Sequence, residues 1–270
     1  MFSGQNGKMK KILLKAIVGV HAAAFLLFSV LAWKEADTCR SCEGVEAIVS
    51  CSLLIKHIPV ASMKAGFLAE RAARYEKAGM QREELADLGA AVGLTGKLPP
   101  EKLLGAYNRL TRLNFQLDKE AEALKYADLA VQNGSLDAEV YMARASMELK
   151  RNKCKAALAD LEKAQSLGYD QPALYINLAS ANMGLGRFDT AYQASKKAGP
   201  KMLTEDDKGQ LSRVLGLTCF ELKRYAESVR HLNKALSYGL NCPDCSEAIA
   251  MAQQLAATRA PAGKKRAKAH

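Results

Sequence analysis

The sequence predicts an all-α fold made of repeated helix–turn–helix units. Three columns of identical residues recur with a period of 34 residues: Tyr107, Tyr141 and Tyr175; Ala123, Ala157 and Ala191; and Ala130, Ala164 and Ala198. A fixed period of this length is the signature of a repeat architecture. Hydrophobic residues make up 49% of the chain but aromatic residues only 6%, a composition that suits close-packed helices better than a β-sandwich.

The segment that begins at Pro172 shows how one unit is built. Its first half has residues on one helical face at Tyr175, Leu178, Ala179 and Asn182. Gly184 and Gly186 then interrupt the helix, and a second helix begins at about 187–189. Small residues follow on one face of this second helix, at Ala191, Ser195 and Ala198. Because one such hairpin cannot bury its apolar stripe alone, neighbouring hairpins have to stack.

This pattern resembles the tetratricopeptide repeat (TPR), which has a period of about 34 residues and a signature of aromatic, Leu-Gly, tyrosine and alanine positions. The resemblance implies a TPR-like α-solenoid of four to five helix–turn–helix repeats with a closing helix. We place the array at residues 65–257, with repeats at about 65–98, 104–137, 138–171, 172–205 and 209–242, and the closing helix at 244–257. Three features depart from the signature: Arg144 stands where leucine is usual, Ser212 replaces an aromatic residue, and the proline that closes each repeat is mostly absent.

Residues 1–33 predict a signal peptide or a transmembrane anchor. A basic cluster, which consists of Lys8, Lys10, Lys11 and Lys15, precedes an apolar run that ends at Ala32. Val30 and Ala32 suit the small or apolar positions of a cleavage site, so the segment could be removed near Ala32. If it is not cleaved, residues 12–33 are long enough to anchor a single-pass membrane protein. Both interpretations place the array outside the cytoplasm, for example in a periplasm.

The resemblance also implies a non-catalytic scaffold that binds a protein or peptide on a concave face formed by the first helix of each repeat. The positions that correspond to this face are Asn108, Arg112, Phe115, Gln116, Met142, Ser146, Leu149, Lys150, Ile176, Ser180, Met183, Arg213, Leu217 and Phe220. Their mixture of apolar side chains with a few cations and no acid suits an amphipathic helix or an extended peptide. Some of these apolar side chains could instead pack between the repeats. An envelope or secretion assembly is the setting that we expect.

The cysteines outside the repeats form two C-x-x-C pairs with one additional cysteine: Cys39, Cys42, Cys51, Cys242 and Cys245. In an oxidising compartment they are candidates for disulfides that secure the two ends of the array, although the sequence does not determine their pairing. A zinc site or a redox-active thiol pair is the alternative function. Zinc would require the two distant C-x-x-C pairs to meet. Cys154 and Cys219 lie inside repeats, where we expect small buried side chains.

No sequence pattern predicts an enzyme, a cofactor or a small-molecule substrate. His57 and His231 lack the neighbouring nucleophile and acid of a catalytic arrangement, and neither a phosphate-binding glycine loop nor a zinc-protease motif occurs. Most of the net charge of +11 lies in residues 1–32 and in the basic tail, residues 258–270, which is predicted to be disordered. A specific nucleic-acid site is therefore not expected.

Residues 34–64 are expected to form a cysteine-containing linker with a short helix, lying on the first repeat or against a membrane surface.

Overall fold

The computed structural model describes residues 29–41, 43–94, 98–201 and 203–259, and this part of the chain contains helices and turns but no strand. Most of the predicted export segment, Cys42 and the basic tail from residue 260 lie outside the described residues. A helix covers residues 29–41. Among the helices that are described, none is both long and apolar enough to cross a membrane.

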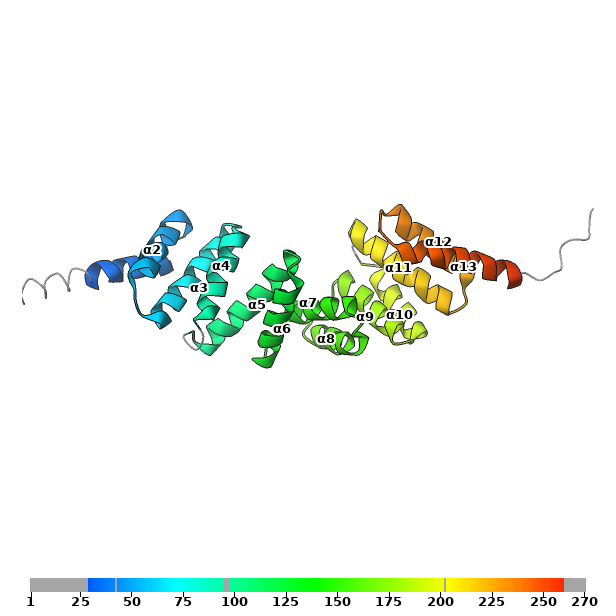
Figure 1. The fold of residues 1–270 in the computed structure, drawn as a ribbon, viewed down its shortest axis with the longest axis horizontal. Coiled ribbons are helices and arrows are strands. Elements are labelled where there is room, and N and C mark those ends of the chain that lie inside the picture. The colour runs from blue at the N-terminus through cyan, green and yellow to red at the C-terminus, as the bar shows by residue number, and fades with distance from the viewer. Residues whose placement is uncertain (1–28, 42, 95–97, 202, 260–270) are drawn as a thin grey trace, which may run out of the picture. The chain divides into compact units, whose positions relative to one another are not determined.

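The chain divides into two compact units, Met1–Leu113 and Asn114–His270. Figure 1 shows the order of the helices along the chain. The first unit contains α2 (Gly44–His57), α3 (Ala61–Lys77), α4 (Gln81–Gly93) and most of α5 (Pro100–Gln116). The second contains α6 (Glu120–Gln132), α7 (Ala138–Lys150), α8 (Cys154–Ser166), α9 (Pro172–Gly184), α10 (Phe188–Ala198), α11 (Glu205–Glu221), α12 (Tyr225–Ser237) and α13 (Pro243–Arg259). From α6 to α13, each helix packs against the next along the chain, as the stacking of an α-solenoid requires.

The turn inside each helix pair has the same geometry throughout the array. One residue in each turn has a positive φ of between 53° and 72°; these residues are Gly79, Asp118, Asn152, Gly186 and Lys223. The N–H that follows each of them donates to a carbonyl five residues earlier, at distances of 2.8 to 2.9 Å. This left-handed cap satisfies carbonyls at the end of the first helix and reverses the chain. Glycine adopts the conformation without strain, whereas Lys223 does not.

Small residues allow the helices to approach one another. All six alanines of the two predicted columns have no exposed surface, namely Ala123, Ala130, Ala157, Ala164, Ala191 and Ala198. They lie on α6, α8 and α10, the second helix of each pair. A larger side chain at any of these positions would have to displace a neighbouring helix, because the interior is already close-packed.

Arg144 occupies a leucine position because it belongs to a buried ion pair within its hairpin. Its Nε and Nη2 both donate to the carboxylate of Asp160 at 2.7 Å, and its Nη1 donates to Asp128 Oδ1 at 3.0 Å. Arg71 donates to Asp87 with the same bidentate geometry, also at 2.7 Å. In both pairs the carboxylate raises the pKa of the arginine through these hydrogen bonds.

The two arginines stand at equivalent places in their hairpins, each 16 residues before its aspartate. At the same two places the other three hairpins have leucine with a tyrosine, an alanine or a histidine: Leu110 with Tyr126, Leu178 with Ala194, and Leu215 with His231. The departure from the signature is therefore a paired exchange in the sequence, in which an arginine and an aspartate stand at two positions where the other hairpins have leucine and a residue that is not acidic.

This exchange predicts strong coupling between Arg144 and Asp160. Arg144→Leu alone should lower the free energy of unfolding by about 3–5 kcal/mol, because Asp160 would remain buried without a counterion. The double variant Arg144→Leu/Asp160→Ala reproduces the Leu178–Ala194 pair and should recover most of that loss. Urea denaturation followed by circular dichroism measures both effects. A double variant no more stable than the single one would contradict this account.

A second prediction concerns the left-handed turn at Lys223. Lys223→Gly should raise the free energy of unfolding by about 0.5–1 kcal/mol, because glycine relieves more strain than it costs in chain entropy. The matched control is Lys163→Gly on the exposed face of α8, where the same change should destabilise by about 1 kcal/mol. The urea midpoints of the two variants should therefore move in opposite directions.

Candidate partner-binding surface

The first helices of successive hairpins form one layer in the second unit. α7 contacts α9, α9 contacts α11, and α11 contacts α13. Polar side chains link neighbouring members of the layer at two junctions. Asn177 Nδ2 on α9 donates to Ser146 Oγ on α7 at 3.0 Å, and Arg213 Nη2 on α11 donates to Asp244 Oδ2 on α13 at 2.5 Å. Nothing in the sequence distinguishes Asn177 or Asp244, since each is an ordinary polar residue until its helix is placed beside the neighbouring one.

Most of the predicted partner-binding residues in this layer are at least partly accessible. Six of them define what we call the first-helix surface, which consists of Ser146, Ser180, Met183, Arg213, Leu217 and Phe220. The hydroxyl groups of Ser146 and Ser180 also donate to carbonyl groups of their own helices at 3.0 Å. Phe220 makes an edge contact with Tyr225, with ring centroids 5.8 Å apart. The surface is thus held in place by contacts within and between the helices.

Two predicted residues of this face are core residues instead. Met142 is 7% exposed and packs in a cluster with Leu161 and Leu174, while Ile176 is 5% exposed and packs with Val214. Their side chains stabilise the contact between successive hairpins and offer little area to a partner. The sequence alone does not separate the two roles, because core and surface positions adjoin on one turn of a helix.

The remaining predicted residues lie at the C-terminal half of α5. Asn108 and Arg112 belong to the first compact unit and are partly buried. Phe115 and Gln116 belong to the second unit and are exposed, and 36% of the surface of Phe115 is accessible. An exposed phenylalanine at the end of a helix is a candidate contact for an apolar partner.

Two cations of the predicted face, Lys150 and Arg213, already have acidic partners within the protein. Lys150 pairs with Glu120 of α6 and lowers the pKa of that carboxyl, while Arg213 pairs with Asp244. Both pairs are open to solvent, where ion pairs contribute little because water and salt screen them. A carboxylate on a partner could therefore replace Glu120 or Asp244 at small cost.

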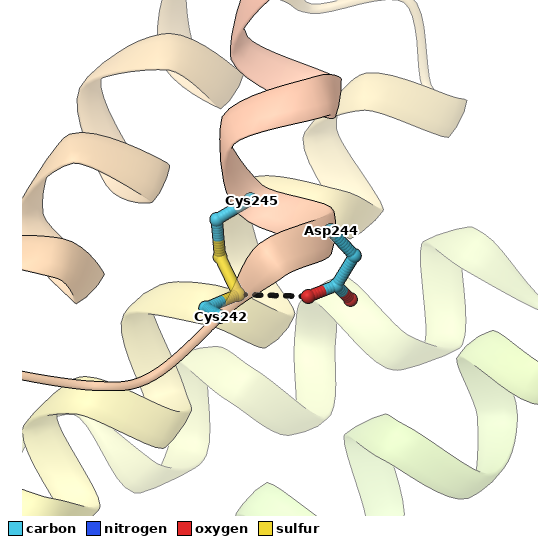
Figure 2. A group of neighbouring side chains, drawn as sticks. All are labelled: Cys242, Asp244 and Cys245. Carbon is cyan, nitrogen blue, oxygen red and sulfur yellow. Dashed lines mark hydrogen bonds between the residues drawn. A yellow bond between two sulfur atoms is a disulfide. The ribbon is translucent and has the colours of Figure 1, made fainter.

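The cysteines form two disulfides in the described residues. Cys39 is bonded to Cys51, and Cys242 is bonded to Cys245 at the start of α13. Figure 2 shows that Asp244 projects from the first turn of α13 toward the second disulfide, with Oδ1 at 2.9 Å from Cys242 Sγ. Cys154 and Cys219 are buried free thiols, and burial raises the pKa of Cys219. Cys154 Sγ fills the space beside Gly184, so its role there is packing.

The chemistry available at Cys242 and Cys245 is limited by burial. The ligand atoms of Cys242, Asp244 and Cys245 lie within 4.8 Å of one another, which is close enough for a metal site in the reduced state. In the disulfide, however, neither sulfur is a thiolate, and metal ligation requires the thiolate. Both cysteines are at most 4% exposed, so an attacking thiolate has no direct path to the bond.

The disulfide pattern predicts which thiols react with an alkylating reagent. In the unfolded but unreduced protein, Cys154 and Cys219 should be alkylated, whereas Cys39, Cys51, Cys242 and Cys245 should become reactive only after reduction. Peptide mass spectrometry with and without reductant measures this pattern. Reaction of Cys242 and Cys245 without reductant would instead favour a thiol or metal role.

Comparisons with known proteins identify the fold. No family model matches the sequence, and no curated protein matches it. Among solved structures, YrrB, described as a TPR protein with an unusual peptide-binding site, aligns with a TM-score of 0.54 and 14% identity, over 75% of this chain and 96% of that chain.

Two other solved structures align at a similar level. A chain of the APC/C hetero-tetramer Cut9–Hcn1 aligns with a TM-score of 0.51 and 16% identity over 86% of this chain, which spans only 44% of that chain's length. A mutant of MamA also aligns with a TM-score of 0.51 and 16% identity, over 66% of this chain and 99% of that chain. At such low identity the likeness concerns the fold alone, and the fold of this chain is an all-α, TPR-like helical repeat.

Proposed function

We propose that this protein is a non-catalytic scaffold that binds a peptide or helix of a partner protein on its first-helix surface. The observation that supports this most directly is the continuity of that surface. Its residues lie on three first helices that contact one another in sequence, and the side chains remain partly accessible after the hairpins have stacked.

The side chains of the first-helix surface suit a protein ligand. Met183, Leu217 and Phe220 provide apolar area, and a methionine adapts its shape to different neighbours. Ser180 adds a hydroxyl that can still accept a hydrogen bond. Because α9 is fixed between α7 and α11, little conformational entropy has to be lost when a partner binds. YrrB, which has a similar fold, is described as having a peptide-binding site, and this agrees with the proposal.

We also propose that the protein works outside the cytoplasm, within an envelope or secretion assembly. Lysines followed by an apolar run within residues 1–33 support export, with residues 12–33 as a membrane anchor if they are retained. Two disulfides support an oxidising compartment, because they rarely persist where thiol reductants are abundant. A thiol-redox or zinc function is less well supported, since the four bonded cysteines are at most 4% exposed.

Charged substitutions on α9 test the proposal. The double variant Ser180→Arg/Met183→Arg places two large cations on the first-helix surface at positions that are only partly buried. We expect capture of a stoichiometric partner from detergent-solubilised membranes to fall by about tenfold or more, a loss of ~1.4 kcal/mol in binding free energy. Far-UV circular dichroism and the thermal midpoint should stay close to those of the unmodified protein.

Leu236→Arg is the matched control for this experiment. Leu236 is 37% exposed on α12, which is a second helix and lies outside the first-helix surface. We expect this variant to retain partner capture. Equal loss in both variants would indicate a general effect of added charge and would count against the first-helix surface as the binding site.

A further inference from the structure

The first compact unit contains a pocket that the proposed function does not use. Its volume is about 300 Å³, and residues from α3, the start of α5 and the helix at residues 29–41 line it. Apolar groups of Met63, Phe67 and Pro99 form part of its wall, and the polar groups beside them come from Arg40, Glu70 and Lys102. A pocket of this size is at the lower limit for small-molecule sites and has room for one large side chain of a partner.

The apolar part of the pocket combines a rigid and an adaptable side chain. Phe67 is 4% exposed and is fixed in a cluster with Cys39, Cys51 and Leu54. Met63 is 51% exposed, although it is a large apolar residue. A methionine in such a position can close over an inserted group, and its sulfur makes favourable contacts with aromatic rings. These features favour an aromatic side chain as the occupant.

The polar groups of the pocket differ in whether they have an acidic partner. Lys102 Nζ donates to Glu70 Oε1 at 2.9 Å, so these two charges neutralise each other. The Arg40 guanidinium lies 5.5 Å from the centre of the Phe67 ring, and no carboxylate within the described part of the chain pairs with it. The pocket thus has an excess of one positive charge, held by a side chain that can donate two parallel hydrogen bonds to a carboxylate.

The position of Arg40 depends on covalent and hydrogen-bonded contacts of its own backbone. The adjacent Cys39 is joined to Cys51 of α2, which fixes the C-terminal turn of the helix at residues 29–41. Arg74 Nη2 on α3 donates to the carbonyl groups of Arg40 at 2.6 Å and Cys39 at 3.2 Å. Because a cation at a helix C-terminus satisfies otherwise unpaired carbonyls, Arg74 holds this helix end beside the pocket.

We propose that this pocket is a second peptide-binding site, which accepts an aromatic side chain flanked by a carboxylate. The aromatic ring inserts between Met63 and Pro99, and the carboxylate accepts hydrogen bonds from Arg40. The Cys39–Cys51 disulfide positions Arg40, so the affinity of the site depends on that bond. The site lies within the first unit and does not include any residue of the first-helix surface, so either proposal can fail without the other.

A titration with short peptides tests this site on the full chain, purified with its disulfides intact. The probe is a blocked pentapeptide with phenylalanine at its centre and an aspartate on each side. The readout is the ¹³C-methyl NMR signal of Met63, assigned by its loss in Met63→Leu. We expect saturable shifts with a Kd of about 0.1–1 mM, as one anchor and one exposed ion pair allow. Replacing the phenylalanine by alanine, or both aspartates by asparagine, should weaken binding.

Substitution of Gly66 provides the sharpest variant, because Gly66 lines the pocket and a Cβ built there meets no atom within 4 Å. Gly66→Leu should fill the pocket and abolish the peptide-induced shifts while leaving the helix intact. Gly105→Leu on α5 is the control, since it is also a helical glycine with open space around it but lies outside the pocket. This control should bind the peptide normally.

Three further variants test the role of Arg40. Arg40→Gln should weaken binding about three- to fivefold, the range expected for an exposed ion pair, and Lys34→Gln, which removes a cation of the same helix, should not. Cys39→Ser/Cys51→Ser should weaken binding to a similar extent as Arg40→Gln.

Equal binding of the alanine peptide, equal effects of Arg40→Gln and Lys34→Gln, or retained binding in Gly66→Leu would each overturn the proposal. Saturable shifts of Met63 with anionic lipid vesicles but not with the peptide would also overturn it.

Discussion

Close contact between helices at fully buried alanines is the constraint on which the rest of this structure depends. Ala130, Ala164 and Ala198 have no exposed surface, and each lies on the second helix of a hairpin. A methyl group is the largest side chain that such a contact tolerates without moving a helix. Because the contact recurs every 34 residues, the hairpins from α6 onward stack with each helix against the next. The first helices then contact one another and form a continuous layer.

Within this constraint, the same two positions in a hairpin can be occupied by chemically different pairs of residues. The bidentate pairs Arg71–Asp87 and Arg144–Asp160 occupy places where other hairpins have leucine and an uncharged partner. The charged solution is viable because both carboxylate oxygens accept hydrogen bonds and the arginine side chains keep 18–19% of their surface. The hydrogen bonds and the remaining contact with solvent together offset the desolvation of the charges. The left-handed turn is equally tolerant, since glycine, asparagine, aspartate and lysine all occupy it.

The two disulfides have different consequences for the surfaces of the molecule. Cys39–Cys51 joins two helices and holds Arg40 beside the pocket, so it acts on a candidate binding site. Cys242–Cys245 closes a short loop within one helix start, where the loss of chain entropy on closing the loop is smaller. Its neighbour Asp244 instead connects α13 to α11 through Arg213. The C-terminal disulfide therefore supports the end of the layer, and the N-terminal one supports the proposed second site.

The sequence by itself determined the fold class, because a 34-residue period with small residues in register leaves little besides stacked helical hairpins. It also indicated the helix faces that could bind a partner, but it did not separate Met142 and Ile176 from Ser180 and Met183. Core and surface residues lie within a few positions of one another on the same helix, as Ile176 and Ser180 do on α9, and only the packing of the neighbouring hairpin decides which side chain is covered. The Asp244–Arg213 contact joins two residues that are 31 positions apart in the sequence. The pocket beside Arg40 is lined by residues from separate helices. Contacts of that kind depend on tertiary structure, since no local pattern encodes the distance between two helices.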